Sequence, residues 1–230
     1  MDRNPGVLDH EIKFVVPASS AGPLCAWVAG VCPPERAHPP ARVSSVYFDT
    51  PGLALLSEKI DSDYLKTKVR VRWYGAIDSR ASAVFAEVKR RVGNRREKTR
   101  VRLDVEAAEI ARWPLSDPRW VALMWPLRAA APELPARLVP VLTLTYVRSR
   151  FVDPRCAARL TLDQHIATTA VNPGVATGRV PAWLDVAVFE YKGALFDVPP
   201  HLRPIVRFGA RRHTFSKYLA CYQAVTRLVL

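Results

Sequence analysis

The residues of this chain that could do chemistry are mostly cations, spaced two apart along segments where charged and apolar side chains alternate. In an extended strand, residues two apart share one face and lie about 6.6–6.8 Å apart. Lys68, Arg70 and Arg72 form one such set. Residues 61–104 hold 13 Lys/Arg against 6 Asp/Glu, a net charge of +7. Cations opposite one another across strands repel, so a bound polyanion such as a phosphate chain would relieve them. The alternative is an ordinary solvated sheet face, which also carries charge but normally mixes both signs.

Three carboxylates each stand two residues before a lysine, in the pairs Glu11–Lys13, Glu87–Lys89 and Glu190–Lys192. A carboxylate beside a cation on one strand face can hold a divalent metal while the lysine holds the phosphate that the metal bridges. A plain ion pair is the alternative for each. Glu190 lies among aromatic and apolar residues, where a charge needs a partner, and this favours it as a metal ligand.

Alternation of period two predicts the elements that position these residues. It predicts eight strands, over residues 9–16, 43–49, 66–74, 83–91, 97–105, 141–151, 158–164 and 185–192. Turn-rich stretches separate them, which favours hairpins and a mostly antiparallel sheet. Helices are predicted over residues 19–30, 51–60, 116–125, where Pro126 should stop the helix, and 214–230.

The C-terminal helix has an apolar stripe for packing and a cation near its start. The predicted stripe is Leu219, Tyr222, Val225 and Val229. Lys217 falls in the first turn, where the helix dipole disfavours a cation. Together with Ser216 and the free backbone N–H groups, the lysine makes better sense as part of an anion site. The alternative is an exposed lysine that reaches into solvent.

Composition bounds the class of protein. The chain has 230 residues, 49% hydrophobic content, 20 prolines and a net charge of +13, which argues for a folded domain of short elements and for polyanionic partners. No domain boundary is visible, so we expect one domain over 1–230. No apolar run is long enough for a membrane helix, and the N-terminus has no signal-peptide core. The four cysteines are scattered without a C-x-x-C pair, which predicts reduced thiols in a cytoplasmic protein and no zinc site. There is no Walker A loop.

Nine motifs, taken in order, resemble a VTC domain, the polyphosphate polymerase branch of the triphosphate tunnel metalloenzymes, which are related to CYTH domains. The motifs are HEIKF (10–14), SVYFDT (45–50), KVRVRWYG (68–75), FAEVKRR (85–91), KTRVR (98–102), YVRSRF (146–151), RLTLD (159–163), FEYK (189–192) and FSKY (215–218). The resemblance covers residues 10 to about 220. The CYTH signature E-x-E-x-K is only approximated, as Asp9-x-Glu11-x-Lys13, and this favours the VTC branch. The chain shows neither the SPX sensor nor the membrane helices of the eukaryotic polymerases.

The resemblance implies an α+β fold: an eight-stranded antiparallel β tunnel, a closed barrel, with helices packed outside and a C-terminal helix. It implies that the charged faces point into the tunnel and the apolar faces outward, beneath the helices. It also implies Mn²⁺ or Mg²⁺ as cofactor. The charged strand faces and the resemblance together predict the site residues. They are Arg70, Arg72, Lys89 and Lys217 for catalysis, Lys13, Lys68, Lys98, Arg100, Arg148, Arg150, Arg159, Lys192 and Ser216 for phosphate, and Glu190, Glu11 and Glu87 for metal.

The expected function is a metal-dependent phosphotransferase that moves the γ-phosphoryl group of ATP onto inorganic polyphosphate. The first alternative is an inorganic triphosphatase of the CYTH type, which would use nearly the same residues with water as acceptor. The second is a module that binds polyphosphate or nucleic acid without catalysis. The net charge permits nucleic acid, but the chain has no RNP-like motif, zinc finger or helix with a basic reading face. The sequence leaves the oligomeric state open.

Overall fold

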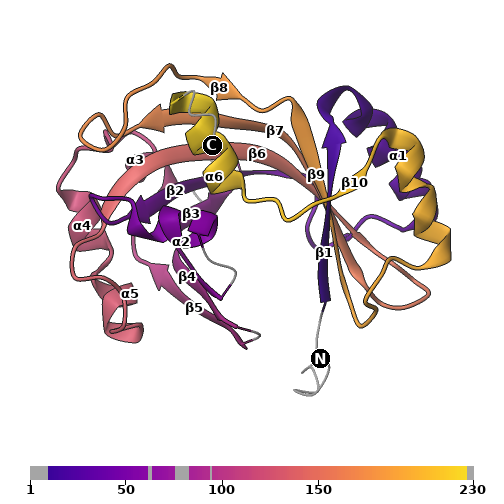
Figure 1. Cartoon of the computed structure of the whole chain (residues 1–230), viewed down its shortest axis with the longest axis horizontal. Helices are drawn as coiled ribbons and strands as arrows, with labels where there is room; N and C mark the ends of the chain where they lie inside the picture. Colours follow the sequence, from indigo (N-terminus) through magenta and orange to yellow (C-terminus); the bar gives the residue numbers. More distant parts are fainter. Residues whose placement is uncertain (1–9, 62–63, 76–82, 94, 227–230) are drawn as a thin grey trace. The chain divides into compact units, whose positions relative to one another are not determined.

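The computed structural model of the chain describes residues 10–61, 64–75, 83–93 and 95–226. Its ten strands form one mostly antiparallel sheet in the order β10-β1-β9-β7-β6-β2-β3-β4-β5, with β8 paired to β7 (Figure 1). The strands are β1 His10–Pro17, β2 Ala41–Asp49, β3 Leu65–Tyr74, β4 Val84–Val92, β5 Arg95–Leu103, β6 Val139–Val152, β7 Arg159–Val171, β8 Ala182–Trp183, β9 Val186–Gly193 and β10 Arg211–Arg212.

The eight predicted strands are confirmed as β1 to β7 and β9, and β8 and β10 are short additions. Residue 9, where the first strand was expected to begin, lies outside the described residues. The prediction of a closed barrel is wrong, because in the described residues the strand order ends at β10 and β5 with no pair between them. Alternation determines which residues share a face, whereas closure depends on strand tilt and stagger. The tunnel therefore stays a prediction.

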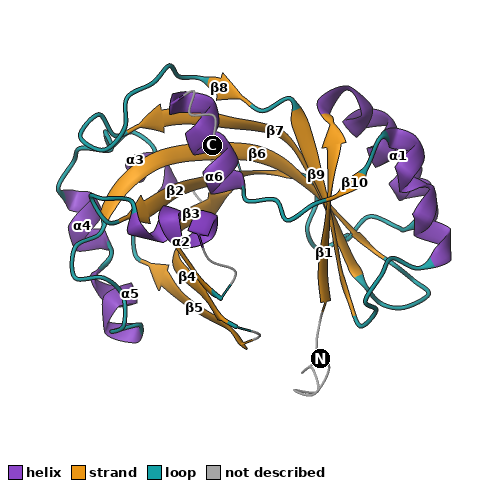
Figure 2. Cartoon of the chain, viewed as in Figure 1, coloured by secondary structure: helices purple, strands orange, loops and turns teal. Residues whose placement is uncertain are grey.

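Short helices connect the strands (Figure 2). In the described residues they are η1 Ala18–Ser20, α1 Ala21–Val31, α2 Ala54–Asp61, α3 Ala107–Ile110, α4 Arg119–Leu123, α5 Trp125–Ala130, η2 Pro200–Phe208 and α6 Lys217–Thr226. The predicted helices over 19–30, 51–60 and 214–230 are confirmed as α1, α2 and α6. The predicted helix over 116–125 is confirmed in part as the shorter α4, which ends at Leu123, before Pro126. Pro126 itself lies in the first turn of the next helix, α5, where no partner for its missing N–H is needed. No described helix has the length and apolar character needed to cross a membrane.

The chain divides into two compact units. Unit 1 comprises Met1–Ala41, Tyr146–Ile166 and Leu184–Ser216, and unit 2 comprises Arg42–Thr145, Ala167–Trp183 and Lys217–Leu230. The expectation of one domain over 1–230 stays a prediction.

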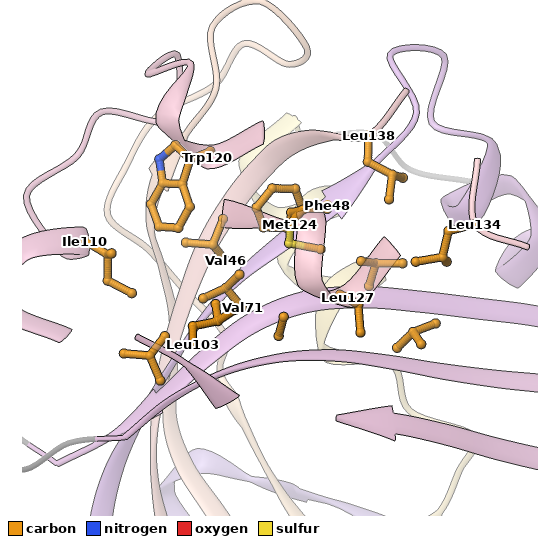
Figure 3. Packing of buried hydrophobic residues seen from close by; sticks show 14 of the residues in the cluster. Val46, Phe48, Val71, Leu103, Ile110, Trp120, Met124, Leu127, Leu134 and Leu138 are labelled. Carbon is orange, nitrogen blue, oxygen red and sulfur yellow. The ribbon is translucent and has the colours of Figure 1, made fainter. Parts of the chain in front are cut away.

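In unit 2 the apolar faces of β2 to β5 pack beneath α3, α4 and α5. Val71 of β3 and Leu103 of β5 lie in one buried cluster with Ile110 of α3, Trp120 of α4 and Leu127 of α5 (Figure 3). Burying each such side chain stabilises the fold by about 1.5–3 kcal/mol. The expectation that the apolar strand faces lie beneath helices is confirmed for these strands, and period two places their charged residues on the opposite face.

In unit 1 a second cluster joins the apolar faces of β1 and β9 to α1 and η2. Phe14 and Phe189 come from the two strands, Leu24 and Val28 from α1, and Leu202 from η2. Glu11 and Lys13 alternate with the buried residues of β1, so they project from the face opposite this core.

The buried face of α6 differs from the predicted stripe. It consists of Tyr218, Cys221 and Val225, whereas Leu219 and Tyr222 are only partly buried. Val229 lies outside the described residues.

Candidate functional site

Four strands of unit 2 bring charged and polar residues into one row across the sheet. Tyr47 of β2 pairs with Arg70 of β3, Arg70 pairs with Glu87 of β4, and Glu87 pairs with Arg100 of β5. Directly paired residues share a face, with Cβ atoms about 4.5–5.5 Å apart. Folding therefore brings residues into one cluster although the first, Tyr47, and the last, Arg100, are 53 positions apart in the sequence.

Glu87 is the centre of this cluster. Its side chain is only 3% exposed. Arg70 Nε and Nη2 donate to Glu87 Oε2 at 2.8 and 2.6 Å, and Lys98 Nζ and Arg100 Nε lie 3.3 and 3.2 Å from Oε1. Burial acts to raise the pKa of Glu87, but the charges of Arg70, Arg72 and Lys98 outweigh it and lower that pKa to about 2. The carboxylate is thus ionised and holds several cations in fixed positions.

These contacts bear on the predicted metal role of Glu87. Both of its oxygens already face guanidinium or ammonium groups, and a divalent cation at the same oxygens would be repelled by them. The geometry favours Glu87 as a positioning residue for phosphate-binding cations, while metal ligation by Glu87 stays an untested prediction.

Next to this row lies a row of three lysines. Lys68 of β3 pairs with Lys89 of β4, and Lys89 pairs with Lys98 of β5. Lys89 is exposed, and the Lys98 side chain is 52% exposed. Like charges directly opposite one another across strands repel, and a bound anion would offset this repulsion together with the Glu87 carboxylate, which lies 3.3 Å from Lys98 Nζ.

On the other side of the Glu87 row, Arg72 pairs with Ser45 of β2 and Phe85 of β4. Arg72 is buried, and its Nε donates to Ser45 Oγ at 3.1 Å. The Arg100 guanidinium carbon lies 3.5 Å from the centroid of the Phe85 ring, a cation–π contact that limits its movement.

Helix α6, which belongs to unit 2, packs against the charged face at Tyr47. Tyr218 stacks on Tyr47, with ring centroids 4.8 Å apart and planes at 7°, and its hydroxyl donates to Asp49 Oδ2 at 3.0 Å. Burial acts to raise the pKa of Tyr47, but Arg70 and Arg72, and to a smaller extent Lys217, lower that pKa. Lys217 is the first residue of α6, as predicted, and its electrostatic effect on Tyr47 associates it with the Arg70 cluster.

Asp49 anchors the start of this arrangement. It is fully buried, and its carboxylate accepts hydrogen bonds from the backbone N–H groups of Thr50, Leu55 and Leu56. Asp49 therefore ties the end of β2 to the first turn of α2 as well as to Tyr218, and the stacked tyrosines are held in place.

In unit 1 the sheet places four charges in a crossed arrangement. Glu11 pairs with Lys192, and Lys13 pairs with Glu190, between β1 and β9. Lys13 Nζ lies 2.5 Å from Glu11 Oε1 and 3.7 Å from Glu190 Oε2, and Lys192 Nζ lies 2.6 Å from Glu190 Oε1. Burial and Glu11 act to raise the pKa of Glu190, but Lys192 and Lys13 lower it.

This quartet has the donors that Mg²⁺ or Mn²⁺ would require. Glu11 and Glu190 interact electrostatically, so two carboxylates lie near one another. Thr161 of β7 pairs with Glu190, and its buried Oγ1 has no hydrogen-bond partner within the described residues. Hard divalent cations prefer oxygen ligands of this kind. Lys13 and Lys192 now face the oxygens of both carboxylates, as Arg70, Lys98 and Arg100 face those of Glu87, so Glu11, Glu190 and Thr161 would hold the metal that the resemblance implies only with both lysines turned away from them.

Arg148, a predicted phosphate ligand, already has a partner. Its Nε and Nη2 donate to the two oxygens of Asp163 at 2.6 and 2.7 Å, and the Asp163 side chain is 1% exposed. Burial acts to lower the pKa of Arg148, but Tyr146 and Asp163 raise it well above its usual value. This geometry favours a structural pair, while phosphate binding by Arg148 stays a prediction.

The structure places the remaining predicted residues in unit 1. Arg150 lies on β6, and Arg159 of β7 pairs with Lys192 of β9, which sets it beside the quartet. Ser216 is buried, and its Oγ has no hydrogen-bond partner within the described residues. Their contacts with phosphate stay predictions.

Sequence reasoning missed the polar residues that hold the charged ones. Tyr47, Asp49 and Thr161 were not singled out, although the first two lie in the SVYFDT motif. Thr161 and Asp163 lie in the RLTLD motif, and Asp163 was not singled out either. No pattern signals these residues, because their roles depend on the register between strands.

Comparison with known proteins identifies the family to which the chain belongs. The model of the VTC domain matches residues 8–226. No curated protein matches the chain. Among solved structures, a protein from Pyrococcus horikoshii OT3 is similar, with a TM-score of 0.50, 12% identity and coverage of 92% of this chain and 97% of that chain. A candidate adenylate cyclase from Bacillus halodurans follows, with a TM-score of 0.48, 16% identity and coverage of 82% of each chain. The structural similarities concern the fold alone. Because the family match spans nearly the whole chain, this protein belongs to the VTC domain family.

Proposed function

We propose that the chain is a phosphotransferase that moves the γ-phosphoryl group of ATP onto the end of an inorganic polyphosphate chain. The observation that carries the proposal is the row of Lys68, Lys89 and Lys98 beside the Arg70–Glu87–Arg100 row. Membership of the VTC family supports an enzyme of the triphosphate tunnel class.

The row of lysines fits a chain of phosphates better than a single anion. Adjacent strands are about 4.7–4.9 Å apart, so three cations in register form a line across the sheet. A linear polyanion along this line would contact each ammonium group in turn and remove their mutual repulsion. Glu87 would keep Arg70 and Arg100 extended toward the same face, which lowers the entropy that phosphate binding would otherwise cost.

The reaction needs no side chain as nucleophile or base. A terminal oxygen of polyphosphate attacks the γ-phosphorus, the bond from that phosphorus to the β–γ bridging oxygen breaks, and ADP leaves. The acceptor is already an anion, so no proton has to be removed. The arginines and lysines neutralise charge on the transferring phosphoryl group and hold both phosphates in line.

The family is metal-dependent in general, and Glu11 and Glu190 are the residues proposed to hold Mn²⁺ or Mg²⁺. A bound divalent ion would neutralise charge on the phosphate oxygens. Lys192 and Lys13 lower the pKa of Glu190, and each lysine contacts both carboxylates.

The deciding experiment is incubation of the purified chain with ATP and Mn²⁺ or Mg²⁺, followed by sizing of the products. We expect polymer ladders on a gel and one ADP released per phosphate incorporated. Release of orthophosphate without polymer would overturn the polymerase proposal and favour the triphosphatase. If neither product forms but the chain still binds tripolyphosphate, the protein is a module that binds polyphosphate without catalysis.

Variants connect the activity to the lysine row. Lys89→Ala removes one exposed cation from its centre and should weaken tripolyphosphate binding by about 1 kcal/mol or more, a roughly fivefold loss. Arg112→Ala is the charge-matched control, because Arg112 is exposed and follows α3, on the helix-covered side of the sheet. If calorimetry shows that both variants bind tripolyphosphate equally well, the lysine row is an ordinary solvated sheet face and the proposal fails.

A further inference from the structure

A separate group of metal-binding side chains lies in unit 1, outside both charged clusters. Its members come from three segments: Cys32 directly follows α1, Asp153 and Cys156 lie in the turn between β6 and β7, and His201 lies in the first turn of η2. The cysteine spacing predicted no zinc site. That reasoning required a C-x-x-C pair, whereas folding brings Cys32 and His201 to the turn that contains Asp153 and Cys156.

The ligand atoms are already close together. One ligand atom from each of Cys32, Asp153 and His201 lies within 4.8 Å of the other two. His201 Nε2 is 2.8 Å from Asp153 Oδ2, and the Sγ atom of Cys156 is 3.2 Å from the same oxygen. Asp153 therefore joins Cys156 to the other two residues, and the Cys156 Sγ atom, which is not among the ligand atoms within 4.8 Å of one another, would turn toward them to complete the set.

The surroundings of Asp153 argue that the group binds a cation. Its side chain is fully buried. In the described part of the chain, its carboxylate contacts the backbone N–H of Arg155, the Cys156 thiol and His201, and no lysine or arginine side chain pairs with it. Among the described residues, the basic side chain that contacts Asp153 is His201, which carries a positive charge only when it is protonated. A metal ion bound by both residues would give this buried carboxylate a fixed positive partner.

We propose that Cys32, Asp153, Cys156 and His201 bind one Zn²⁺ ion. Two sulfurs, one imidazole nitrogen and one carboxylate oxygen make the four-ligand set typical of tetrahedral zinc. Sulfur ligands favour zinc over the magnesium or manganese that suits the oxygen donors of Glu11 and Glu190. Each chain would therefore contain two metal sites of different chemistry.

The role of this zinc would be structural. The ion would connect the end of α1, the turn between β6 and β7 and the start of η2, elements whose apolar residues already pack together in the core of unit 1. With four protein ligands it would have no open position for substrate. Cys156 is exposed, which gives the ion a route into the site from solvent.

The test uses the full chain, purified under reducing conditions, stripped with a chelator and titrated with Zn²⁺ alone or Co²⁺ alone. We expect one Zn²⁺ bound per chain by metal analysis. With Co²⁺ we expect a thiolate-to-cobalt charge-transfer band and the d–d bands of tetrahedral coordination. Added Zn²⁺ should raise the melting temperature of the stripped protein.

Variants separate this site from other thiols and from the Glu190 metal. Cys156→Ser changes an exposed position, so folding should be spared. It should weaken Zn²⁺ binding by about tenfold or more, since loss of an outer-shell partner alone costs that much. It should also remove part of the charge-transfer band. Cys25→Ser is the matched thiol control and should change neither, and Glu190→Gln should retain the zinc. Binding that stays unchanged in Cys156→Ser, the absence of cobalt bands in the wild-type chain, or a Cys32–Cys156 disulfide in their place would each overturn the proposal.

Discussion

Replacement of Glu87 with glutamine should destabilise the empty protein and enlarge the stabilisation that tripolyphosphate provides. The change keeps the size of the side chain but removes the negative charge that Arg70, Lys98 and Arg100 share. The cations would then repel one another without a counter-charge. A bound polyphosphate would restore that counter-charge, so the ligand should recover part of the lost stability.

The magnitude follows from two independent arguments. The pKa of Glu87 falls from 4.5 to about 2, which corresponds to about 3 kcal/mol at ~1.4 kcal/mol per pH unit. Removing one partner of a buried ion pair typically costs about 3–5 kcal/mol. Lys98 and Arg100 are 52% and 37% exposed and can turn toward water, so we expect the lower end, about 3 kcal/mol.

The effect should depend on pH with a definite sign. Because the folded pKa of Glu87 is lowered, its contribution is complete above about pH 4.5 and is lost as the pH falls from there through about 2. The wild-type chain and Glu87→Gln should therefore differ most in stability near neutral pH, and the difference should close progressively below pH 4.5.

Urea unfolding at pH 7 with and without tripolyphosphate measures both effects. Glu97→Gln is the control: it removes the same charge from the neighbouring strand β5, where Glu97 is 45% exposed and pairs with Arg95 at 2.8 Å. An exposed pair contributes about 0–1 kcal/mol. Equal losses in the two variants, or a Glu87→Gln protein that gains no more from tripolyphosphate than wild type, would refute the reasoning.

Three further predictions concern side chains that support the clusters. Asp163→Asn leaves the Arg148 guanidinium without its carboxylate, so the free energy of unfolding in urea should fall by about 3–5 kcal/mol; a loss below about 1 kcal/mol would contradict a structural pair. Tyr218→Phe removes the hydroxyl that donates to buried Asp49 and should cost about 1–3 kcal/mol, seen as a lower melting temperature, and an unchanged melt would argue against this bond. Lys217→Ala removes a cation from the start of α6. It should slow phosphoryl transfer at least tenfold while stabilising the empty protein by about 0.3–1 kcal/mol; wild-type activity with a full ligand-induced shift would exclude Lys217 from the site.

Several features were readable from local pattern. Strict alternation in β3 predicted that Lys68, Arg70 and Arg72 share one face, and the pairing of β3 with β2 and β4 is consistent with this. Helix boundaries were less predictable, since α4 ends at Leu123, before the proline expected to stop it, and Pro126 lies in the first turn of α5. Proline is compatible with either position, and local sequence does not distinguish them.

The sequence by itself determined the strands, their charged and apolar faces, the Lys217 position at the start of a helix, and the family. These depend on residues close together in the chain, where period and propensity act directly. Only the tertiary structure decided which charges meet. The register of β3, β4 and β5 made Glu87 the partner of four cations, and folding brought Asp153 to Cys32 and His201. A shift of one residue in the register of these strands would turn their side chains to the opposite face. Such contacts depend on how whole elements pack, which no short motif specifies.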